Sequence, residues 1–313
     1  MHPVSGPPSN PSLRLAVLGI GQMGLPMAQR LVAAGFAVTV WNRSRSKAEQ
    51  VRGAAVAANA AEAVREADVV ISLLENGDVV QAVLFGAQEA AATEITAGAA
   101  AAMRPGCLVI DMASIQPAQA RDHAQRLAAL GVAHLDAPVS GGTLGAENGT
   151  LAIMVGGSSA DFARAAPVFA VFGRATHVGT HGTGQLAKLA NQMIVGITIG
   201  AVAEALLLCQ KGGADMARVI DAMGGGFADS RILQVHGQRM AQRDFAPRGR
   251  MAIQLKDLRN ALGTAQGLGF DAPITVLFEQ LYAQAIAQQQ AAGLGELDHS
   301  GLFVELARRN AMQ

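Results

Sequence analysis

Three glycines near the N-terminus constrain this 313-residue chain more than any other feature. They form a G-x-G-x-x-G pattern that follows the apolar run 13–18 and opens a segment with helical spacing, residues 23–34. In such a unit the first glycine permits a tight turn, the second lets the backbone approach a pyrophosphate, and the third lets the helix pack closely on the strand. The helix N-terminus adds N–H donors for the phosphates. We therefore predict a dinucleotide-binding turn made by Gly19, Ile20, Gly21, Gln22, Met23 and Gly24.

The rest of the first half alternates between two kinds of segment. Apolar runs occur at residues 36–41, 69–74 and 108–110, and polar helical segments such as 46–52 and 116–130 lie between them. Strand runs without polar alternation, separated by amphipathic helices, predict a parallel sheet that is covered on both faces.

From about residue 177 onward the periodicity is helical, in segments 182–212, 215–223, 230–242, 255–267 and 274–290. The sequence thus predicts an α/β fold, with an N-terminal doubly wound Rossmann sheet and an all-α C-terminal domain. We place the Rossmann domain at residues 13–180 and the helical domain, which begins with a long interdomain helix, at residues 181–313. Residues 1–12 are expected to form a disordered lead-in and not a signal peptide. The alanine-rich stretch 87–102 is interpreted as a helix or a surface insertion.

Composition excludes several classes of partner. Lysine plus arginine equals aspartate plus glutamate, at 24 each, so charge gives no reason to expect nucleic acid or an anionic membrane. The apolar stretch 189–203 is shorter than the roughly 20 residues of a membrane span and predicts a buried helix. Cys107 and Cys209 make no disulfide framework, which favours a reducing, cytoplasmic compartment. His177 and His181 have glycines nearby and no cysteine, so no metal site is expected.

The end of the second predicted strand bears on the choice of cofactor. Asn42, Arg43 and Ser44 stand where NAD enzymes usually place an acid for the ribose hydroxyls. A carboxylate would repel a 2′-phosphate, whereas Arg43 would pair with it. We therefore predict cofactor contacts at these three residues and a preference for NADP, with NAD as the alternative. An ordinary solvated turn would also explain the arginine.

Two further segments contain residues that could bind an anion or transfer a proton. Ser140, Gly141 and Gly142 offer consecutive backbone N–H groups that can surround an anion, although a plain glycine turn has the same composition. Lys188 lies near the start of the helix expected from Thr183, with Asn191 three residues later on the same face.

Near the positive helix end and an apolar wall formed by Leu186, Leu189 and Met193, Lys188 should hold its proton less tightly. That suits a group which gives a proton to a carbonyl oxygen. A lysine that extends from a helix end into solvent is the simpler alternative. Ser114 follows a strand end, where open sheets place ligand contacts.

Five segments, in order, resemble the β-hydroxyacid dehydrogenase family. They cover essentially all of the chain after the first twelve residues. They are Gly19-Ile-Gly-Gln-Met-Gly-Leu-Pro-Met-Ala28, Asp136-Ala-Pro-Val-Ser-Gly-Gly142, Gly182-Thr-Gly-Gln-Leu-Ala-Lys188-Leu-Ala-Asn191-Gln192, Lys256-Asp257-Leu258 and Asp298-His299-Ser300. The segment from Lys188 and the ending Gly293-Leu-Gly-Glu-Leu-Asp-His-Ser are most similar to the tartronate semialdehyde reductase branch; 3-hydroxyisobutyrate dehydrogenases and other members are the alternatives. Ala113 and Glu75 depart from residues that are common in this family.

The resemblance implies an NAD(P)-dependent oxidoreductase that interconverts a small β-hydroxyacid and its semialdehyde. It implies that Ser140, Gly141 and Gly142 bind the substrate carboxylate and that Lys188 and Asn191 are catalytic, with Asn191 either orienting the lysine ammonium or holding the substrate oxygen. Cofactor contacts are implied at Leu73, Leu74, Ser114 and Lys256, and a homodimer or homotetramer is implied as the assembly. A non-catalytic dinucleotide sensor is the alternative of a different class. A sensor needs neither an anion site nor a lysine near it, so these residues together favour an enzyme.

Overall fold

The structure is a computed structural model that describes residues 13–86, 98–293 and 295–312. The expected lead-in, residues 1–12, and residues 87–97 of the alanine-rich stretch lie outside the described residues. The end of that stretch forms a 3-10 helix, η1 (Ala99–Ala102). The chain divides into two compact units, Met1–Lys188 and Leu189–Gln313.

The first unit contains a mixed sheet with the order β3-β2-β1-β4-β5-β6-β8-β7, and β9 pairs with β8. Its strands are β1 (Arg14–Leu18), β2 (Ala37–Trp41), β3 (Ala55–Val56), β4 (Val69–Ser72), β5 (Leu108–Asp111), β6 (Ala133–Asp136), β7 (Val139–Ser140), β8 (Leu151–Gly157) and β9 (Gly173–Gly179). The six strands from β3 to β6 are parallel, which confirms the doubly wound fold predicted from the sequence. Beyond β6, the strand β8 runs antiparallel to both β6 and β7, an extension that the periodicity did not indicate.

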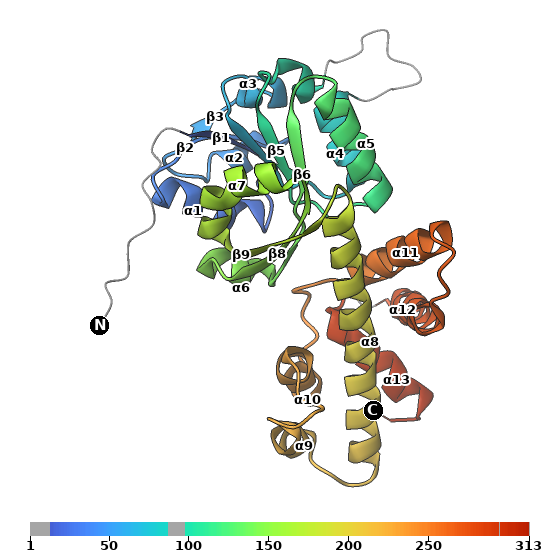
Figure 1. The fold of residues 1–313 in the computed structure, drawn as a ribbon. Helices are drawn as coiled ribbons and strands as arrows, with labels where there is room; N and C mark the ends of the chain where they lie inside the picture. Colours follow the sequence, from blue (N-terminus) through green and yellow to red (C-terminus); the bar gives the residue numbers. More distant parts are fainter. Residues whose placement is uncertain (1–12, 87–97, 294, 313) are drawn as a thin grey trace, which may run out of the picture. The chain divides into compact units, whose positions relative to one another are not determined.

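Helices cover both faces of this sheet, as Figure 1 shows. Helices α1 (Gly24–Ala33) and α7 (Ser159–Phe172) contribute Met27, Leu31, Phe169 and Phe172 to one buried cluster. Helices α3 (Ala60–Val64), α4 (Gly77–Phe85) and α5 (Pro117–Ala128) contribute to the cluster on the other face. Two short helices, α2 (Arg45–Ala48) and α6 (Gly142–Asn148), lie in the connections after β2 and β7. Because both faces are covered, ligands reach this sheet at the ends of its strands.

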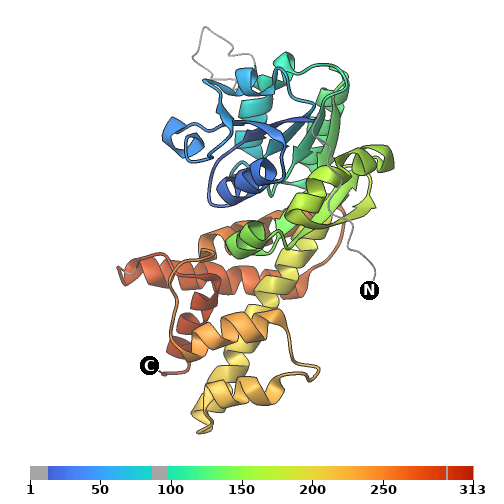
Figure 2. The ribbon, with the colours of Figure 1, turned by 90° about the vertical axis from the view of Figure 1, so that its left-hand side faces the viewer.

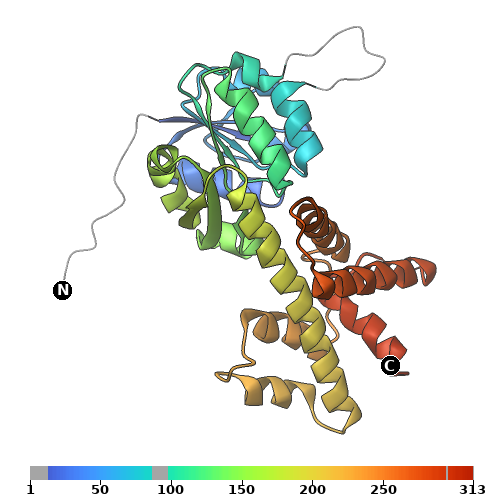
Figure 3. The same cartoon turned by 45° about the vertical axis from the view of Figure 1, so that its right-hand side comes forward.

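The second unit is helical and is built around the long helix α8 (Thr183–Lys211), whose first six residues belong to the first unit. In Figure 3, α9 (Met216–Met223) and α10 (Gln238–Ala241) lie on one side of α8, and α11 (Met251–Gly267), α12 (Pro273–Ala291) and α13 (Leu302–Arg309) lie on the other. Helices α9 and α10 pack side by side, as Figure 2 also shows. A π-helix, η2 (Leu233–Gly237), interrupts the helix expected at residues 230–242.

Small residues of α8 make room for its neighbours in this unit. A Cβ added to Gly200 would lie 2.0 Å from the Phe278 ring of α12, and a Cβ added to Gly196 would lie 2.5 Å from Gln254 Nε2 of α11. Within the described residues, α8 is the helix that is long and apolar enough to cross a membrane, a test that core helices of soluble proteins also pass.

Candidate active site

The glycine turn leaves the carboxyl end of β1 and leads into α1. Gly19 has φ +102°, and a Cβ there would lie 2.4 Å from Leu73 O. A Cβ on Gly24 would lie 2.0 Å from Gly19 O, so both positions exclude any side chain. At Gly21, by contrast, a Cβ would meet no atom of the described residues within 4 Å. Two glycines therefore close the turn, while the middle one adjoins open space near the start of α1, which suits a pyrophosphate site.

This turn lies where the order of the sheet reverses. The chain runs outward from β1 to β2 and β3, and then returns to β4 on the other side of β1. Leu73 follows β4 and donates its N–H to Leu18 O at 2.8 Å, which brings Leu73 and Leu74 next to the glycine turn. The carboxyl ends of strands at such a switch point are where open α/β sheets bind ligands.

The end of β2 contributes one internal contact and one exposed cation. Asn42 Oδ1 accepts the N–H of Ile20 at 2.9 Å, and its Nδ2 donates to Ser44 O at 3.1 Å. Asn42 therefore supports the glycine turn from the neighbouring strand, a role that the sequence did not suggest. Arg43 is exposed and makes no ion pair with the described residues, whereas the nearby Arg45 pairs with Glu49. A guanidinium at this place suits a phosphate.

The loop after β5 is tied to α8 by one glutamine. Gln185 Oε1 accepts the N–H of Ile115 at 3.1 Å, and Gln185 Nε2 donates to Ala113 O at 2.8 Å. Between them, Ser114 Oγ is buried and has no hydrogen-bond partner among the described residues. A buried hydroxyl without a partner at a strand's carboxyl end fits a contact to a bound molecule. These residues and the open space at Gly21 fit a dinucleotide cofactor.

Two buried carboxyl groups lie at the same edge of the sheet. Asp111 ends β5, and its Oδ1 accepts the Ser72 hydroxyl at 2.6 Å; burial raises the pKa of Asp111 to about 7. Asp136 ends β6 and accepts the N–H groups of Gly182 (2.8 Å) and Gln185 (2.9 Å). Burial raises the pKa of Asp136 as well, although these two N–H donors oppose the shift. Asp136 thus caps the start of α8.

Close packing fixes the first turn of α8 at this edge. A Cβ on Gly184 would lie 2.5 Å from both Asp136 O and Met154 O, so only glycine fits between β6, β8 and the helix. Lys188 follows on the next turn of α8, and Asn191 lies one turn further, in the part of the helix that belongs to the second unit. Lys188 is half-buried, whereas Leu186, expected in its apolar wall, is exposed.

Ser140, Gly141 and Gly142 form the end of β7 and the start of α6. Gly141 has φ +139° and Gly142 has φ +64°, conformations that side chains disfavour. A Cβ on Gly141 would lie 3.0 Å from Leu151 Cδ2, while one on Gly142 would meet no described atom within 4 Å. The backbone here is therefore held in a glycine-specific shape, and both glycines are exposed, which suits an anion site.

In the second unit, two hydrogen bonds and one ion pair connect Asn191 to Lys256 through two buried residues. Asn191 Nδ2 donates to Gln192 Oε1 at 2.8 Å, and Gln192 Nε2 donates to Asp257 Oδ2 at 2.8 Å. The other oxygen, Asp257 Oδ1, lies 3.2 Å from Lys256 Nζ. From the sequence we predicted Asn191 and Lys256 as site residues, but not Gln192 and Asp257, which connect them. The adjacency of Asp257 to Lys256 was a usable signal.

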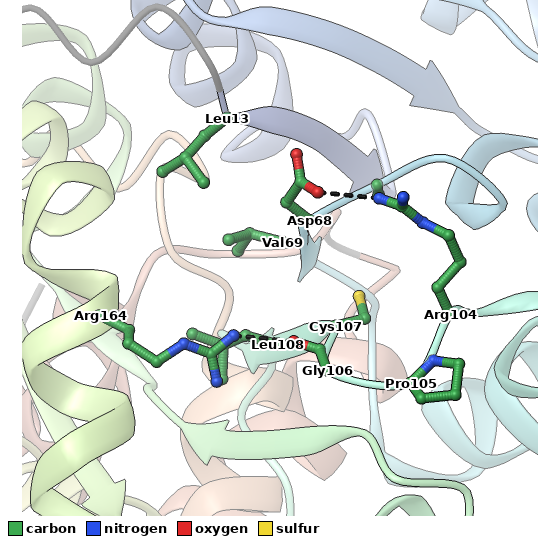
Figure 4. A pocket seen from close by; sticks show the side chains of 10 residues that line it. Leu13, Asp68, Val69, Arg104, Pro105, Gly106, Cys107, Leu108 and Arg164 are labelled. Carbon is green, nitrogen blue, oxygen red and sulfur yellow. Dashed lines mark hydrogen bonds and ion pairs between the residues drawn. The ribbon is translucent and has the colours of Figure 1, made fainter.

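One cavity of the first unit lies away from these residues. It has a volume of about 450 Å³ and lies at the amino ends of β4 and β5 (Figure 4). The two arginines that line it are already engaged: Arg104 pairs with Asp68 at 2.8 Å, and Arg164 donates to Gly106 O at 2.8 Å. The glycine turn, Asp111, Ser114 and Asp136 lie instead at the carboxyl ends of their strands.

Two family models match the chain in succession. The NAD binding domain of 6-phosphogluconate dehydrogenase matches residues 14–182, and the NAD-binding domain of NADP-dependent 3-hydroxyisobutyrate dehydrogenase matches residues 182–305. Among curated proteins, 2-hydroxy-3-oxopropionate reductase of Escherichia coli (strain K12) is 41% identical over 296 residues, which are 94% of this chain and 97% of that protein.

Solved structures agree with these matches. Mycobacterium tuberculosis 3-hydroxyisobutyrate dehydrogenase with L-serine is similar at TM-score 0.81 and 34% identity, over 94% of this chain and 99% of that one. Psf3 in complex with NADP+ and 2-OPP is similar at TM-score 0.79 and 25% identity, over 93% of this chain and 99% of that one.

Proposed function

The chain belongs to the β-hydroxyacid dehydrogenase family of NAD(P)-dependent oxidoreductases, and on this premise we propose that it is an NADPH-preferring 2-hydroxy-3-oxopropionate (tartronate semialdehyde) reductase that forms D-glycerate. The observation that carries the proposal is the 41% identity with the Escherichia coli enzyme of that name along nearly the whole length of both chains. The substrate is then a small carboxylate with an aldehyde next to its hydroxyl-bearing carbon.

Each predicted site residue has a role in this reaction. When bound, the nicotinamide cofactor supplies the hydride that reduces the aldehyde carbon. The N–H groups of Gly141 and Gly142 and the Ser140 hydroxyl bind the substrate carboxylate. Lys188 gives its proton to the carbonyl oxygen as negative charge develops there, and Asn191 orients the lysine ammonium. The chain's own contribution is thus anion binding and the movement of one proton.

The cofactor preference rests on Arg43 and on the absence of an acid at the end of β2. An exposed guanidinium at that position forms charged hydrogen bonds with a 2′-phosphate and would gain less from the neutral hydroxyls of NAD. The similarity to the NADP complex of Psf3 supports the same preference. Lys256, which lies beside Asp257, is proposed as a further contact to the cofactor, and NAD remains usable at lower efficiency.

A second substrate assignment has its own support. The family model over residues 182–305 and the Mycobacterium tuberculosis structure are both 3-hydroxyisobutyrate dehydrogenases. Methylmalonate semialdehyde differs from tartronate semialdehyde in having a methyl group in place of a hydroxyl. A site that hydrogen-bonds the hydroxyl would discriminate strongly against the analogue that lacks it. The two assignments therefore predict different substrate rankings.

We also propose that the enzyme acts in the cytoplasm as a homodimer or homotetramer. The second unit supports the assembly, because it exposes several large apolar side chains on α8 and α12, including Ile194, Leu208, Ile274 and Leu277. Light scattering at micromolar concentration should give a mass of at least twice 32.1 kDa. A monomer would contradict the proposed assembly.

The deciding experiment is a substrate panel. Tartronate semialdehyde, methylmalonate semialdehyde, succinic semialdehyde and glyoxylate are each reduced with NADPH and with NADH, and kcat/KM is compared. We expect tartronate semialdehyde with NADPH to rank first. Methylmalonate semialdehyde in first place would select the second assignment. Tight NADPH binding without turnover of any of the four would favour the sensor.

A further inference from the structure

A buried run of hydrogen bonds in the second unit determines how two proposed site residues are held. Gln192 uses both ends of its side-chain amide: the oxygen accepts from Asn191, and the nitrogen donates to Asp257, each at 2.8 Å. Gln192 is 7% exposed and Asp257 is 2% exposed, so water does not compete for these contacts. Both residues lie outside the set that the proposed function uses.

The Asp257 carboxylate fixes the order of donors and acceptors along this run of hydrogen bonds. A carboxylate only accepts hydrogen bonds, so Asp257 requires the nitrogen end of the Gln192 amide. The oxygen end of Gln192 then faces Asn191 and requires its nitrogen. The remaining polar atom of the Asn191 amide, Oδ1, is thereby left to face other groups as an acceptor. One negative charge on α11 thus fixes the orientation of two successive amides on α8.

Neighbouring contacts restrict the rotation of the Gln192 and Asp257 side chains. Gln254, which is fully buried, donates Nε2 to the backbone oxygen of Gln192 at 2.8 Å. Gly196 leaves the space that Gln254 occupies, since a Cβ there would lie 2.5 Å from Gln254 Nε2. The same Asp257 carboxylate lies 3.2 Å from Lys256 Nζ through its other oxygen. Asp257 is therefore shared between the amide run and the lysine.

We propose that Gln192 and Asp257 are positioning residues that present Asn191 Oδ1, and not its N–H groups, to the ammonium of the proton donor Lys188. The inference rests on the proposed function, in which Asn191 orients that ammonium. An oxygen acceptor stabilises an ammonium, whereas amide N–H groups would repel it. Asp257 has a second role as the anion that holds Lys256 for the cofactor.

The test is a double-mutant cycle on kcat, because residues that act through one another are not additive. Gln192→Met removes both polar ends at similar length. It should lower kcat about tenfold, the size of one hydrogen bond to a charged group. If Gln192 acts only through Asn191, the double variant Gln192→Met/Asn191→Ala should be no slower than Asn191→Ala alone. Binding of NADPH should stay within about twofold of the unmodified enzyme, since Lys256 keeps its anion.

Asp257→Asn is the second variant, and it keeps the shape of the side chain. An amide at this position can donate as well as accept, so it no longer fixes the orientation of the Gln192 and Asn191 amides. We expect a fall in kcat similar to that of Gln192→Met, together with a several-fold weaker Kd for NADPH because Lys256 loses its partner. In both variants the alkaline limb of the kcat–pH profile should move to lower pH, since an ammonium without its acceptor gives up its proton more easily.

Matched controls separate positioning from loss of fold. Gln289→Met makes the same change at another buried glutamine of the unit, which donates to Gly295 O. Glu279→Gln neutralises an acid that pairs with Arg259 between α11 and α12. Neither control should shift the pH profile, and melting temperatures show whether each variant is folded.

The outcomes are distinct. The positioning role would be overturned if the two losses in kcat multiplied in the double variant. It would also be overturned if Gln192→Met kept the kcat and pH profile of the unmodified enzyme while Asn191→Ala was impaired. Either outcome leaves the proposed function standing. If Gln192→Met does not fold, an unchanged kcat–pH profile in Asp257→Asn overturns it equally. Unchanged kcat in both Lys188→Ala and Asn191→Ala would remove the proton-donor assignment, and the positioning role with it.

Discussion

Asp136 Oδ2 accepts the backbone N–H of Gln185 at 2.9 Å and thereby connects the end of the β6 strand to the first turn of α8. The other oxygen of Asp136 accepts the N–H of Gly182, so one carboxylate satisfies two of the donors that every helix start leaves unpaired. Because Lys188 lies on the next turn of this helix, the contact also sets the position of the proposed proton donor relative to the sheet.

Asp136→Ala should therefore destabilise the first unit and slow the reaction. Each buried N–H left without a partner costs about 1–3 kcal/mol, and this change removes the hydrogen-bond acceptor of two such groups. Urea unfolding should show the loss, with kcat measured on the folded fraction. Asp161→Ala is the control, since the Asp161 carboxylate in the first turn of α7 bonds to the side chains of Ser158 and Arg164 and caps no backbone N–H of the described residues. Equal unfolding free energies for the two variants would contradict a capping role for Asp136.

Lys188→Ala should lower kcat by at least about a hundredfold, the lower end of what general acid catalysis contributes. Binding of NADPH should survive, since the glycine turn is unchanged. Lys188→Arg keeps the charge and should still fail, because a guanidinium hardly releases its proton. Asn191→Ala should cost less than Lys188→Ala.

Lys211→Ala, at the far end of the same helix, serves as the control for Lys188→Ala in stopped-flow single turnovers. A nearly normal kcat in Lys188→Ala would move the acid role to water or to Lys256.

Arg43→Asp should reduce the ratio of kcat/KM for NADPH over NADH by at least about tenfold, since it removes a phosphate partner and adds repulsion. Arg45→Asp is the matched neighbour, because Arg45 is already paired with Glu49. The two ratios come from initial rates with each cofactor at saturating substrate. An unaltered ratio in Arg43→Asp would contradict the 2′-phosphate contact.

Gly141→Val should raise KM for the substrate strongly while the Kd for NADPH changes little. Valine strains a backbone with φ +139° and approaches Leu151, so the anion-binding shape is lost. Gly35→Val tests strain alone, at φ +86° with open space around it. The methyl ester of the substrate provides an independent check on the unmodified enzyme. Turnover of the ester at the rate of the free acid would remove the carboxylate role.

His134 should make the protein sensitive to acid. Burial, with smaller contributions from His181 and His123, lowers the pKa of His134 from 6.5 to about 3. Between these two pH values the unfolded chain binds a proton that the folded chain does not, so the free energy of unfolding falls as pH falls below 6.5.

The full shift corresponds to about 5 kcal/mol, most of which is lost by pH 3. His134→Leu should flatten this dependence in urea titrations between pH 7 and pH 4. An unchanged slope would show that other groups dominate the acid response.

Local patterns were sufficient to predict the glycine turn, the strands β1, β2, β4 and β5, and the long helix. In each case the signal lies within a few residues, as a φ requirement at Gly19 or a continuous apolar run. The strand β6 was missed because it includes His134 and Asp136, polar residues that become buried only through partners far along the chain.

The same reason explains what was missed in the candidate site. Gln185 meets Ile115 across 70 residues, and Gln192 meets Asp257 across 65. A glutamine in a helix has the same appearance in the sequence whether it faces solvent or bridges two elements. The direction of each side chain emerges only when the helices pack, so these connections could not be read from spacing.

The boundary between the two compact units falls between Lys188 and Asn191, within an unbroken helix. Three residues of α-helix rise about 4.5 Å, so the backbone of a single turn sets the spacing between the proposed proton donor and its proposed orienting amide. The continuous helix α8 carries both residues. Their spacing along the helix axis therefore follows from local backbone hydrogen bonding and needs no tertiary contact to define it.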